Sequence, residues 1–369
     1  IYNDSFHVPH ILAENERDLF FAQGFVTAQQ RFFQMDLLRR TAAGRLAEVF
    51  GRQAVASDSL VLTLGLSKTA EESLPSLSAQ SRSVLSAYTA GINSYLETHK
   101  NKLPLEFTLL GYTPARWRPE HCLAVMGLIS WQYSSGYLSE PVISTLIDRT
   151  GPAQTAELLP DINLTGVTEE MLDGLFFSTD KRARGFSSLP VGKIGLSWAA
   201  AGKKTVTGKP MLYSGFNSGS GLPSLFFENY LSGGNLNVYG FSIPGIPLII
   251  AGRNEVLAWG INTFPADNLD FFVETPNPAD KQLYKYGDGF REFIYREETI
   301  PVFADSALTL TVKESVHGPV VSDFFGSGSV LALAWTGFDP DDTCLSLYKL
   351  AGAGNRTQFR EALTTYSLF

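Results

Sequence analysis

Ser197 is the first residue to consider for covalent chemistry, because it lies in a short apolar stretch, residues 196–201, that follows a long polar segment. A serine hydroxyl attacks a carbonyl carbon when a base accepts its proton. Cysteine chemistry finds less support, since the chain has only Cys122 and Cys344, far apart in sequence, and no Cys/His cluster with metal-ligand spacing. Ser197 is therefore either a nucleophile or an ordinary strand serine.

The composition is that of an aromatic-rich globular chain. The 369 residues carry a net charge of -8, and no long Lys/Arg run is present, which argues against binding to nucleic acid. The densest basic cluster, residues 181–184, is expected to be a solvated loop. The longest apolar runs, such as residues 241–252, are interrupted by Pro and Gly and are too short to span a bilayer. The start at Ile1 shows no signal peptide, so we expect a trimmed chain.

Helical spacing dominates the first part of the chain. Apolar residues recur there at intervals of three and four, which is typical of helices with one packed face. The predicted helices cover residues 20–38, 78–98, 121–137 and 140–150. Prolines make residues 103–107 and 112–117 loop-like.

After a polar stretch of weak periodicity the chain becomes rich in strands separated by Gly and Pro. The predicted strands are residues 196–201, 210–213, 225–230, 236–241, 248–251, 256–261, 270–274, 307–316, 320–322 and 330–335, with helices at 345–350 and 357–368. This order favours an α+β layered fold. We expect a helical region at 1–158, a spacer at 159–193 and a β-rich core at 194–369.

Ordered motifs along almost the whole chain carry a family resemblance. Residues 23–36 read Gln-Gly-Phe-Val-Thr-Ala-Gln-Gln-Arg-Phe-Phe-Gln-Met-Asp, and Arg-Arg and Gly-Arg-Leu-Ala-Glu follow at 39–40 and 44–48. Pro-Gly-Ile-Pro, Gly-Arg-Asn, Trp-Gly-Ile-Asn-Thr and His-Gly-Pro-Val come later, from residue 244 onward. Together these blocks resemble the penicillin acylase family, with Arg253 in place of the usual His. We expect the polar residues of the first blocks to form a buried network.

The resemblance implies the N-terminal-nucleophile (Ntn) hydrolase fold, an αββα sandwich, here with a preceding helical region and C-terminally incomplete. In such enzymes a Ser at a newly exposed chain start attacks an amide carbonyl, after the precursor has cut itself through an acyl shift onto the same oxygen. Trp198 and the Gly-Lys-Pro step at 208–210 fall in register with the family and place Gly195 on the nucleophile. Glycine has no side-chain oxygen, so neither step can occur there.

Other positions of the implied active site also differ. Ser197 lies about 7 Å further along a strand than Gly195, which favours a strand serine over a surrogate nucleophile. Asn217 stands where the family often has His, and it either orients a bound amide or is a plain loop residue. Thr263 stands where the family supplies a backbone N–H to the oxyanion hole, a donor independent of side-chain identity. The remaining oxyanion residues of the family would lie beyond Phe369.

The same resemblance implies a calcium loop. Asp267 and Asp270 match its two carboxylates, Leu269 matches its backbone carbonyl, and Glu140 falls about where the helical part adds a further carboxylate. Hard oxygen ligands of this kind suit Ca²⁺. The alternative is that these are ordinary surface or capping carboxylates. No organic cofactor is expected.

The expected function is that of an N-acyl amide hydrolase homologue that does not self-cleave and is weakly active or inactive. The alternative is a non-catalytic relative that binds amides or a partner. Further changes accompany Gly195, at Ile194, Leu196, Asn217 and Arg253, and favour divergence over a single engineered substitution. The expected ligand is a small N-acylated amide, with no nucleic acid and no membrane span. A periplasmic or secreted location is implied by the resemblance alone.

Overall fold

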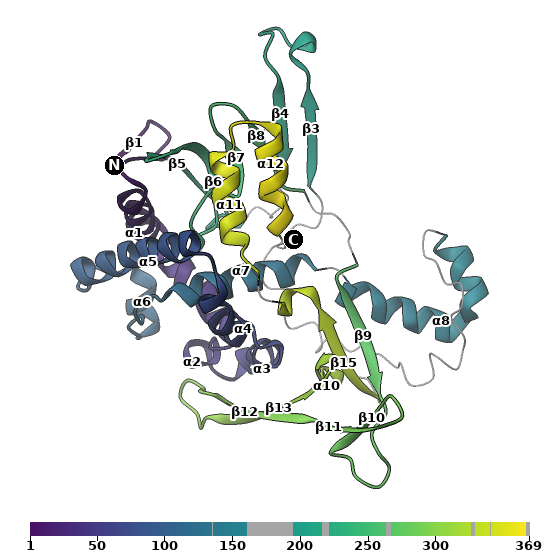
Figure 1. Cartoon of the computed structure of the whole chain (residues 1–369). Helices are drawn as coiled ribbons and strands as arrows, with labels where there is room; N and C mark the ends of the chain where they lie inside the picture. The colour runs from purple at the N-terminus through teal and green to yellow at the C-terminus, as the bar shows by residue number, and fades with distance from the viewer. Residues whose placement is uncertain are drawn as a thin grey trace.

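The chain combines a helical first part with a strand-rich second part (Figure 1). The computed structural model describes residues 1–134, 136–160, 195–215, 221–262, 267–325, 329–339 and 341–366. Within them the predicted α+β class is confirmed. The αββα arrangement stays a prediction, and most of the predicted spacer at 159–193 lies outside the described residues.

The described helices agree with the four predicted in the first part and add shorter ones between them. They are α1 (Glu16–Ala42), α2 (Ala47–Phe50), α3 (Val55–Leu64), α4 (Leu66–Ser73), α5 (Ala79–His99), α6 (Leu105–Leu110), α7 (Pro119–Tyr133), α8 (Gly136–Leu158), α10 (Ser322–Phe325), α11 (Thr343–Gly352) and α12 (Arg356–Ala362). The loop prediction for 103–107 was wrong, because Pro104 caps α6 and Gly111, with φ 69°, ends it. None of these helices is long and apolar enough to cross a membrane.

The described strands form one large sheet and several small ones. They are β1 (Tyr2–Asn3), β2 (Pro9–Leu12), β3 (Leu196–Ala200), β4 (Met211–Gly215), β5 (Phe227–Gly233), β6 (Leu236–Ser242), β7 (Ala251–Arg253), β8 (Ala258–Trp259), β9 (Leu269–Glu274), β10 (Leu283–Tyr286), β11 (Gly289–Glu292), β12 (Ile294–Ile300), β13 (Leu308–Ser315), β14 (Gly318–Pro319) and β15 (Val330–Trp335). The six-stranded sheet has the order β1-β2-β5-β6-β7-β8. The strand predicted at 320–322 was largely wrong, since only Val320 bridges to Ala332 and Ser322 begins α10.

Two glycines allow α1 and α5 to cross at close range. A Cβ atom on Gly24 would lie 2.0 Å from the backbone oxygen of Tyr88, and one on Gly91 would lie 1.9 Å from the backbone oxygen of Phe21. Real Cβ atoms do not approach backbone atoms so closely, so each glycine faces the backbone of the other helix. This crossing fixes the helix pair on which the sheet packs.

Polar residues of α1 connect this helix to the six-stranded sheet, as predicted. Gln23 is fully buried, and its Nε2 donates to Asn229 Oδ1 on β5 at 3.3 Å. Its Oε1 accepts the backbone N–H of Leu248 at 3.2 Å. A single hydrophobic core contains side chains from both the helical part and the strand-rich part. The two predicted regions therefore share one core.

The β3–β4 hairpin extends away from this core (Figure 1). Its strands pair antiparallel, with Leu196 opposite Gly215 and Ser197 opposite Ser214. Side chains on both faces of β3 and β4 are exposed, including Leu196 and Trp198. Gly195 directly precedes β3, so the predicted nucleophile position lies at the base of this hairpin.

Candidate functional site

The space beside Gly195, the predicted nucleophile position, is taken by the side chain of Asn262. A Cβ atom built on Gly195 would lie 2.4 Å from Asn262 Oδ1 and 3.2 Å from the backbone oxygen of Gly215. The Asn262 carboxamide thus fills the space next to Gly195 that the Cβ atom of a serine would need. Asn262 stands at the Thr position of the family's Trp-Gly-x-Thr-Asn block. Sequence reasoning missed Asn262, because its contact with Gly195 joins segments that are far apart in the sequence and no local pattern indicates it.

Ser197 has the contacts of a strand serine. Its Oγ lies 3.1 Å from Ser214 Oγ, and Ser214 Oγ donates to the carbonyl of Ile261 at 3.2 Å. Because Ser214 uses its single proton on that carbonyl, Ser197 is the donor in the serine pair. Within the described part of the chain, no histidine, lysine or carboxylate contacts Ser197. Among the described residues, therefore, no side chain is placed to act as a base for this hydroxyl, which favours an ordinary strand serine over a nucleophile.

The other two predicted active-site positions, Asn217 and Thr263, lie outside the described residues. The described residues that precede them most closely in the sequence are Gly215 and Asn262. Both of these lie against Gly195, from β4 and from the segment after β8. At Gly215 and Asn262, the last residues described before the two gaps, both chain segments lie against Gly195.

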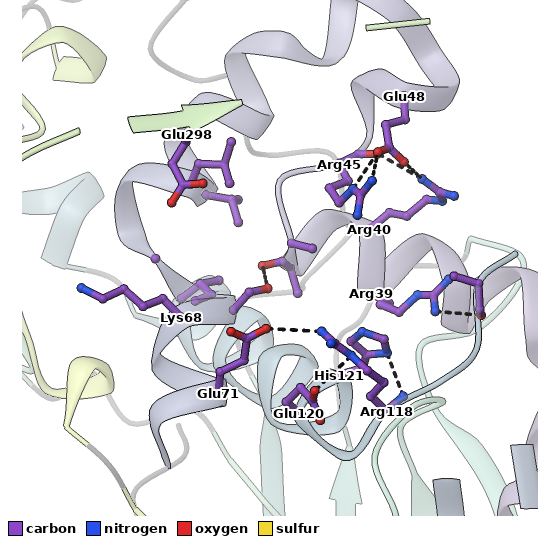
Figure 2. Close-up of a pocket in the computed structure, with 18 of the residues that line it drawn as sticks. Arg39, Arg40, Arg45, Glu48, Lys68, Glu71, Arg118, Glu120, His121 and Glu298 are labelled. Atoms are coloured by element: carbon purple, nitrogen blue, oxygen red, sulfur yellow. Dashed lines mark hydrogen bonds and ion pairs between the residues drawn. The ribbon is translucent and has the colours of Figure 1, made fainter. Parts of the chain in front are cut away.

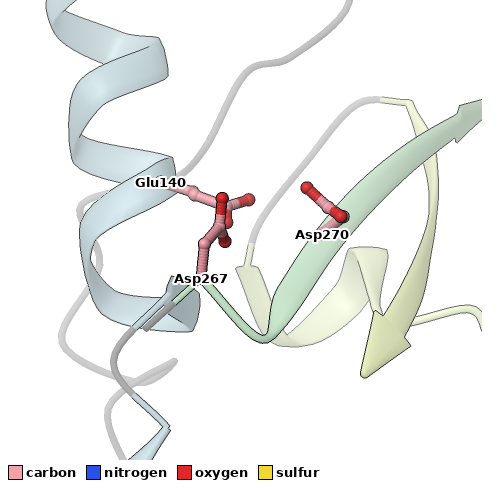
Figure 3. A group of neighbouring side chains, drawn as sticks. All are labelled: Glu140, Asp267 and Asp270. Carbon is pink, nitrogen blue, oxygen red and sulfur yellow. The ribbon is translucent and has the colours of Figure 1, made fainter. Parts of the chain in front are cut away.

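Three carboxylates from distant parts of the chain gather in one place (Figure 3). Glu140 on α8, Asp267 just before β9 and Asp270 on β9 each offer an oxygen, and these oxygens lie within 4.8 Å of one another. Burial, with the negative charges of Asp270 and Asp267, raises the pKa of Glu140 to about 7. Leu269 begins β9, and its buried side chain has no ligand atom. It could therefore contribute only its backbone carbonyl. This donor set, three hard oxygens with mutual repulsion, fits a divalent cation such as Ca²⁺.

A charged cavity of about 460 Å³ lies where α1, α3, α4 and α7 meet β12 (Figure 2). Its charges are paired: Arg40 contacts Glu48 at 2.6 Å, and Arg118 contacts Glu71 at 3.3 Å and Glu120 at 3.0 Å. These residues include the Arg-Arg and Gly-Arg-Leu-Ala-Glu blocks. The network therefore ties elements together, as the sequence predicted for these blocks.

His121, which also lines this cavity, is held in its neutral form. Burial and the charges of Arg39, Arg118 and Arg45 lower its pKa to about 3. Its Nδ1 accepts the backbone N–H of Arg118 at 3.0 Å. Neutral at ordinary pH and with one nitrogen already engaged, the ring orients the start of α7.

The whole chain matches one protein family. The model described as "Penicillin amidase" covers residues 1–368, so the chain belongs to the penicillin amidase family. The match extends across the helical part, the hairpin with Gly195 and the carboxylate cluster. Residues such as Gly195 and Arg253, which depart from the family motifs, therefore lie inside the matched region.

Two relatives and one solved structure illustrate the similarity. The chain is 30% identical over 390 residues to penicillin acylase 2 proenzyme of Pseudomonas sp. (strain SE83), covering 100% of this chain and 49% of that protein. It is 29% identical to the acyl-homoserine lactone acylase QuiP of Pseudomonas syringae pv. tomato, covering 94% of this chain and 44% of that protein. The chain spans about half the length of these relatives. A thermostable penicillin G acylase from Alcaligenes faecalis aligns over 40% of this chain and 27% of its own, at 26% identity and a TM-score of 0.36.

Proposed function

We propose that this chain is a member of the amide-bond acylases that neither cleaves itself nor hydrolyses N-acyl amides at more than a weak rate. The relatives' names support the class of substrate, an N-acylated amine. One observation carries the proposed loss: Gly195 offers no side chain, and Asn262 Oδ1 lies where that side chain would begin.

Self-cleavage and amide hydrolysis both need a nucleophilic side-chain atom, and glycine has none. In an acyl shift the side-chain oxygen attacks the carbonyl of the preceding residue, an ester forms, and the peptide C–N bond breaks as its nitrogen takes up a proton. In hydrolysis the same oxygen attacks the substrate amide. Both sequences of steps begin with an oxygen or sulfur atom that Gly195 lacks. Ser197 has a hydroxyl but no base among the described residues.

The first test is the integrity of the purified chain. We expect one species of 40.4 kDa on a denaturing gel and by mass spectrometry, because no residue at the cleavage position can start the acyl shift. Two fragments that meet before Gly195 or before Ser197 would show that the chain still cuts itself, and the proposal would be wrong.

The second test is turnover of a chromogenic phenylacetyl or fatty-acyl amide. We expect the rate of the wild-type chain to equal that of the Ser197→Ala variant, since Ser197 donates its proton to Ser214. A wild-type rate at least tenfold above that of the variant would establish Ser197 as a nucleophile.

A second candidate function is the binding of an amide without cleavage. The observation that favours it is the carboxamide of Asn262 beside Gly195, because it presents a donor and an acceptor where the reacting atom would stand. Calorimetry with N-phenylacetyl- or N-fatty-acyl amides would detect this binding. Loss of that binding in Asn262→Ala would support the function, and unchanged binding would assign the ligand to another site.

We propose in addition that Glu140, Asp267, Asp270 and the carbonyl of Leu269 hold a structural Ca²⁺. The support is the gathering of three carboxylates from α8, β9 and the residues just before β9, because a cation between them would relieve their mutual repulsion. A bound ion would join two elements that are more than a hundred residues apart in the sequence. Its role would be to hold β9 against α8.

Calcium should therefore raise the thermal stability of the chain. At about one hundred times its Kd, a ligand of the folded state alone contributes about 2.7 kcal/mol. In a thermal scan of the wild type, we expect the melting temperature to fall on chelation and to rise again when Ca²⁺ is re-added. The rise should vanish in Asp270→Asn and persist in the control Asp288→Asn, which alters an exposed carboxylate outside the cluster. An equal rise in both variants would exclude this site.

The finer fold and the location remain proposals of the same kind. We propose that the six-stranded sheet is one layer of an αββα sandwich, and the family match supports this. We propose a periplasmic or secreted location, again on the strength of family membership. Fractionation of the native host, with detection of the chain by antibody, tests the location directly.

A further inference from the structure

A row of side chains crosses the outer face of the six-stranded sheet. The strand register places opposite one another, from β1 to β7, Tyr2, His10, Tyr230, Tyr239 and Arg253. Residues directly opposite on neighbouring strands project from the same face. The alternate residues of β5 and β6 are buried and point to the core. The row is therefore not needed to fill the core.

The members of this row contact one another in a fixed arrangement. The rings of Tyr2 and His10 stack with centroids 4.8 Å apart, and those of His10 and Tyr230 lie 5.2 Å apart. The guanidinium carbon of Arg253 lies 5.7 Å from the centroid of the Tyr239 ring. Stacked rings and a cation over an aromatic face restrict the rotamers of all five side chains.

A chain of hydrogen bonds orients the polar groups beside this row. Tyr230 Oη donates to Asn237 Oδ1 at 2.6 Å, and Asn237 Nδ2 donates to Glu255 Oε1 at 2.9 Å. The second carboxylate oxygen of Glu255 and the guanidinium of Arg253 have no hydrogen-bond or ion-pair partner within the described residues. Polar groups are therefore held in place with bonding capacity left for a ligand.

A cavity of about 410 Å³ lies over this part of the sheet. Its size falls in the range of small-molecule sites, roughly 300–1,000 Å³. Every described residue that lines it carries a hydrogen-bonding side chain, and none is aliphatic. An acyl chain would find apolar contact there only at the tyrosine rings, so this is a poor pocket for the acyl group of an amide. It shares no described residue with the region around Gly195.

The charges of the lining select among polar ligands. Asp4 and Glu255 are negative, and Arg253 is positive. An anion would meet the two carboxylates, and a simple cation would meet the guanidinium. A neutral ligand is repelled by neither kind of charge. If it carries adjacent hydroxyls, carboxylate, carboxamide and guanidinium groups can each hydrogen-bond two of them at once. Tyrosine rings offer flat faces against which the C–H side of a sugar ring packs. We propose that this cavity binds a neutral saccharide of one or two rings.

Calorimetry or saturation-transfer NMR on the whole chain tests the proposal. The probes are glucose, N-acetylglucosamine, cellobiose and diacetylchitobiose, with inorganic phosphate and ethanolamine as the charged alternatives. We expect saturable binding of at least one of the four sugars, with a Kd on the order of 1 mM, typical of a small polar ligand in an open site. Binding of phosphate or ethanolamine with no sugar binding would overturn the proposal.

Two variants locate the binding. Glu255→Ala alters an exposed residue, so we expect the fold to be kept, and Tyr239→Ala removes the ring under Arg253. We expect each to weaken sugar binding at least tenfold. The matched control is Tyr213→Ala, an exposed tyrosine on β4 outside this cavity, which should bind as the wild type does. Unchanged binding in Glu255→Ala, or absence of binding to all four sugars, would refute the assignment whatever the outcome of the acylase assays.

Discussion

Replacing Gly91 with alanine is expected to lower the free energy of unfolding by about 3 kcal/mol, at the upper end of overpacking effects. The new methyl group would lie 1.9 Å from the backbone oxygen of Phe21 and 2.8 Å from the backbone nitrogen of Phe25. Backbone atoms of a helix cannot rotate away as a side chain can. The helices α1 and α5 would have to separate, and this would disturb the core that α1 shares with the sheet. Urea denaturation measures the loss.

The chain supplies a matched control for this substitution in Gly127 on α7. A Cβ atom there would lie 3.8 Å from Leu66 Cδ2, an ordinary contact. Because alanine is favoured over glycine in a helix by roughly 1 kcal/mol, Gly127→Ala should be neutral or stabilising. The same intrinsic gain acts at residue 91, so a loss there is a packing effect. Equal stability of the two variants would show that the close crossing is absent.

Replacing Asp36 with alanine is expected to cost about 3–5 kcal/mol, the cost of breaking a buried ion pair. Its carboxylate is fully buried and contacts the guanidinium of Arg39, Arg40 Nε at 3.0 Å and Tyr112 Oη at 2.8 Å. Burial lowers the pKa of Arg39, and the charge of Asp36 opposes that shift. Without the carboxylate, the buried charge of Arg39 would lose its ion-pair partner and keep only the carbonyls of Ala115 and Arg116 and the ring of Trp117.

The contrast for this prediction is an exposed ion pair of similar geometry. Arg116 and Glu97 lie 2.7 Å apart, and both side chains are more than half exposed. Solvent screening makes such a pair worth about 0–1 kcal/mol, so Glu97→Ala should change stability little. Chemical denaturation of both variants compares them directly. Similar losses for Asp36→Ala and Glu97→Ala would mean that the network around Asp36 does not stabilise the fold.

The helices and strands in which apolar residues recur regularly over many positions could be predicted from the sequence, and those without such a pattern could not. The interval of three and four predicted α1, and its family block predicted the buried polar network of Gln23 and Asp36. Helices α2 to α4 are short, so their apolar spacing extends over too few residues to stand out, and strands β10 to β12 have few buried residues. Their stability comes from contacts with distant segments, which local patterns do not encode.

The candidate site shows the same division. Register with the family placed Gly195, and the calcium motif named Glu140, Asp267 and Asp270, whose oxygens the structure brings together. Their role as ligands stays a prediction. The contact of Asn262 with Gly195 depends on how the chain after β8 approaches the base of the β3–β4 hairpin. Gly195 and Asn262 are far apart in the sequence, so their contact is non-local and no local spacing of residues could indicate it.

The common core of the helical and strand-rich parts has a consequence for how this chain could change. Gln23 bonds to both Asn229 and Leu248, and apolar side chains from both parts fill one interior. Those contacts hold the two parts together through space, with or without a covalent bond before Gly195. Folding therefore places no demand on whether that peptide bond is broken. If that bond stays whole, the chain keeps every one of these contacts, so loss of the cleavage step would not by itself remove what holds the two parts together.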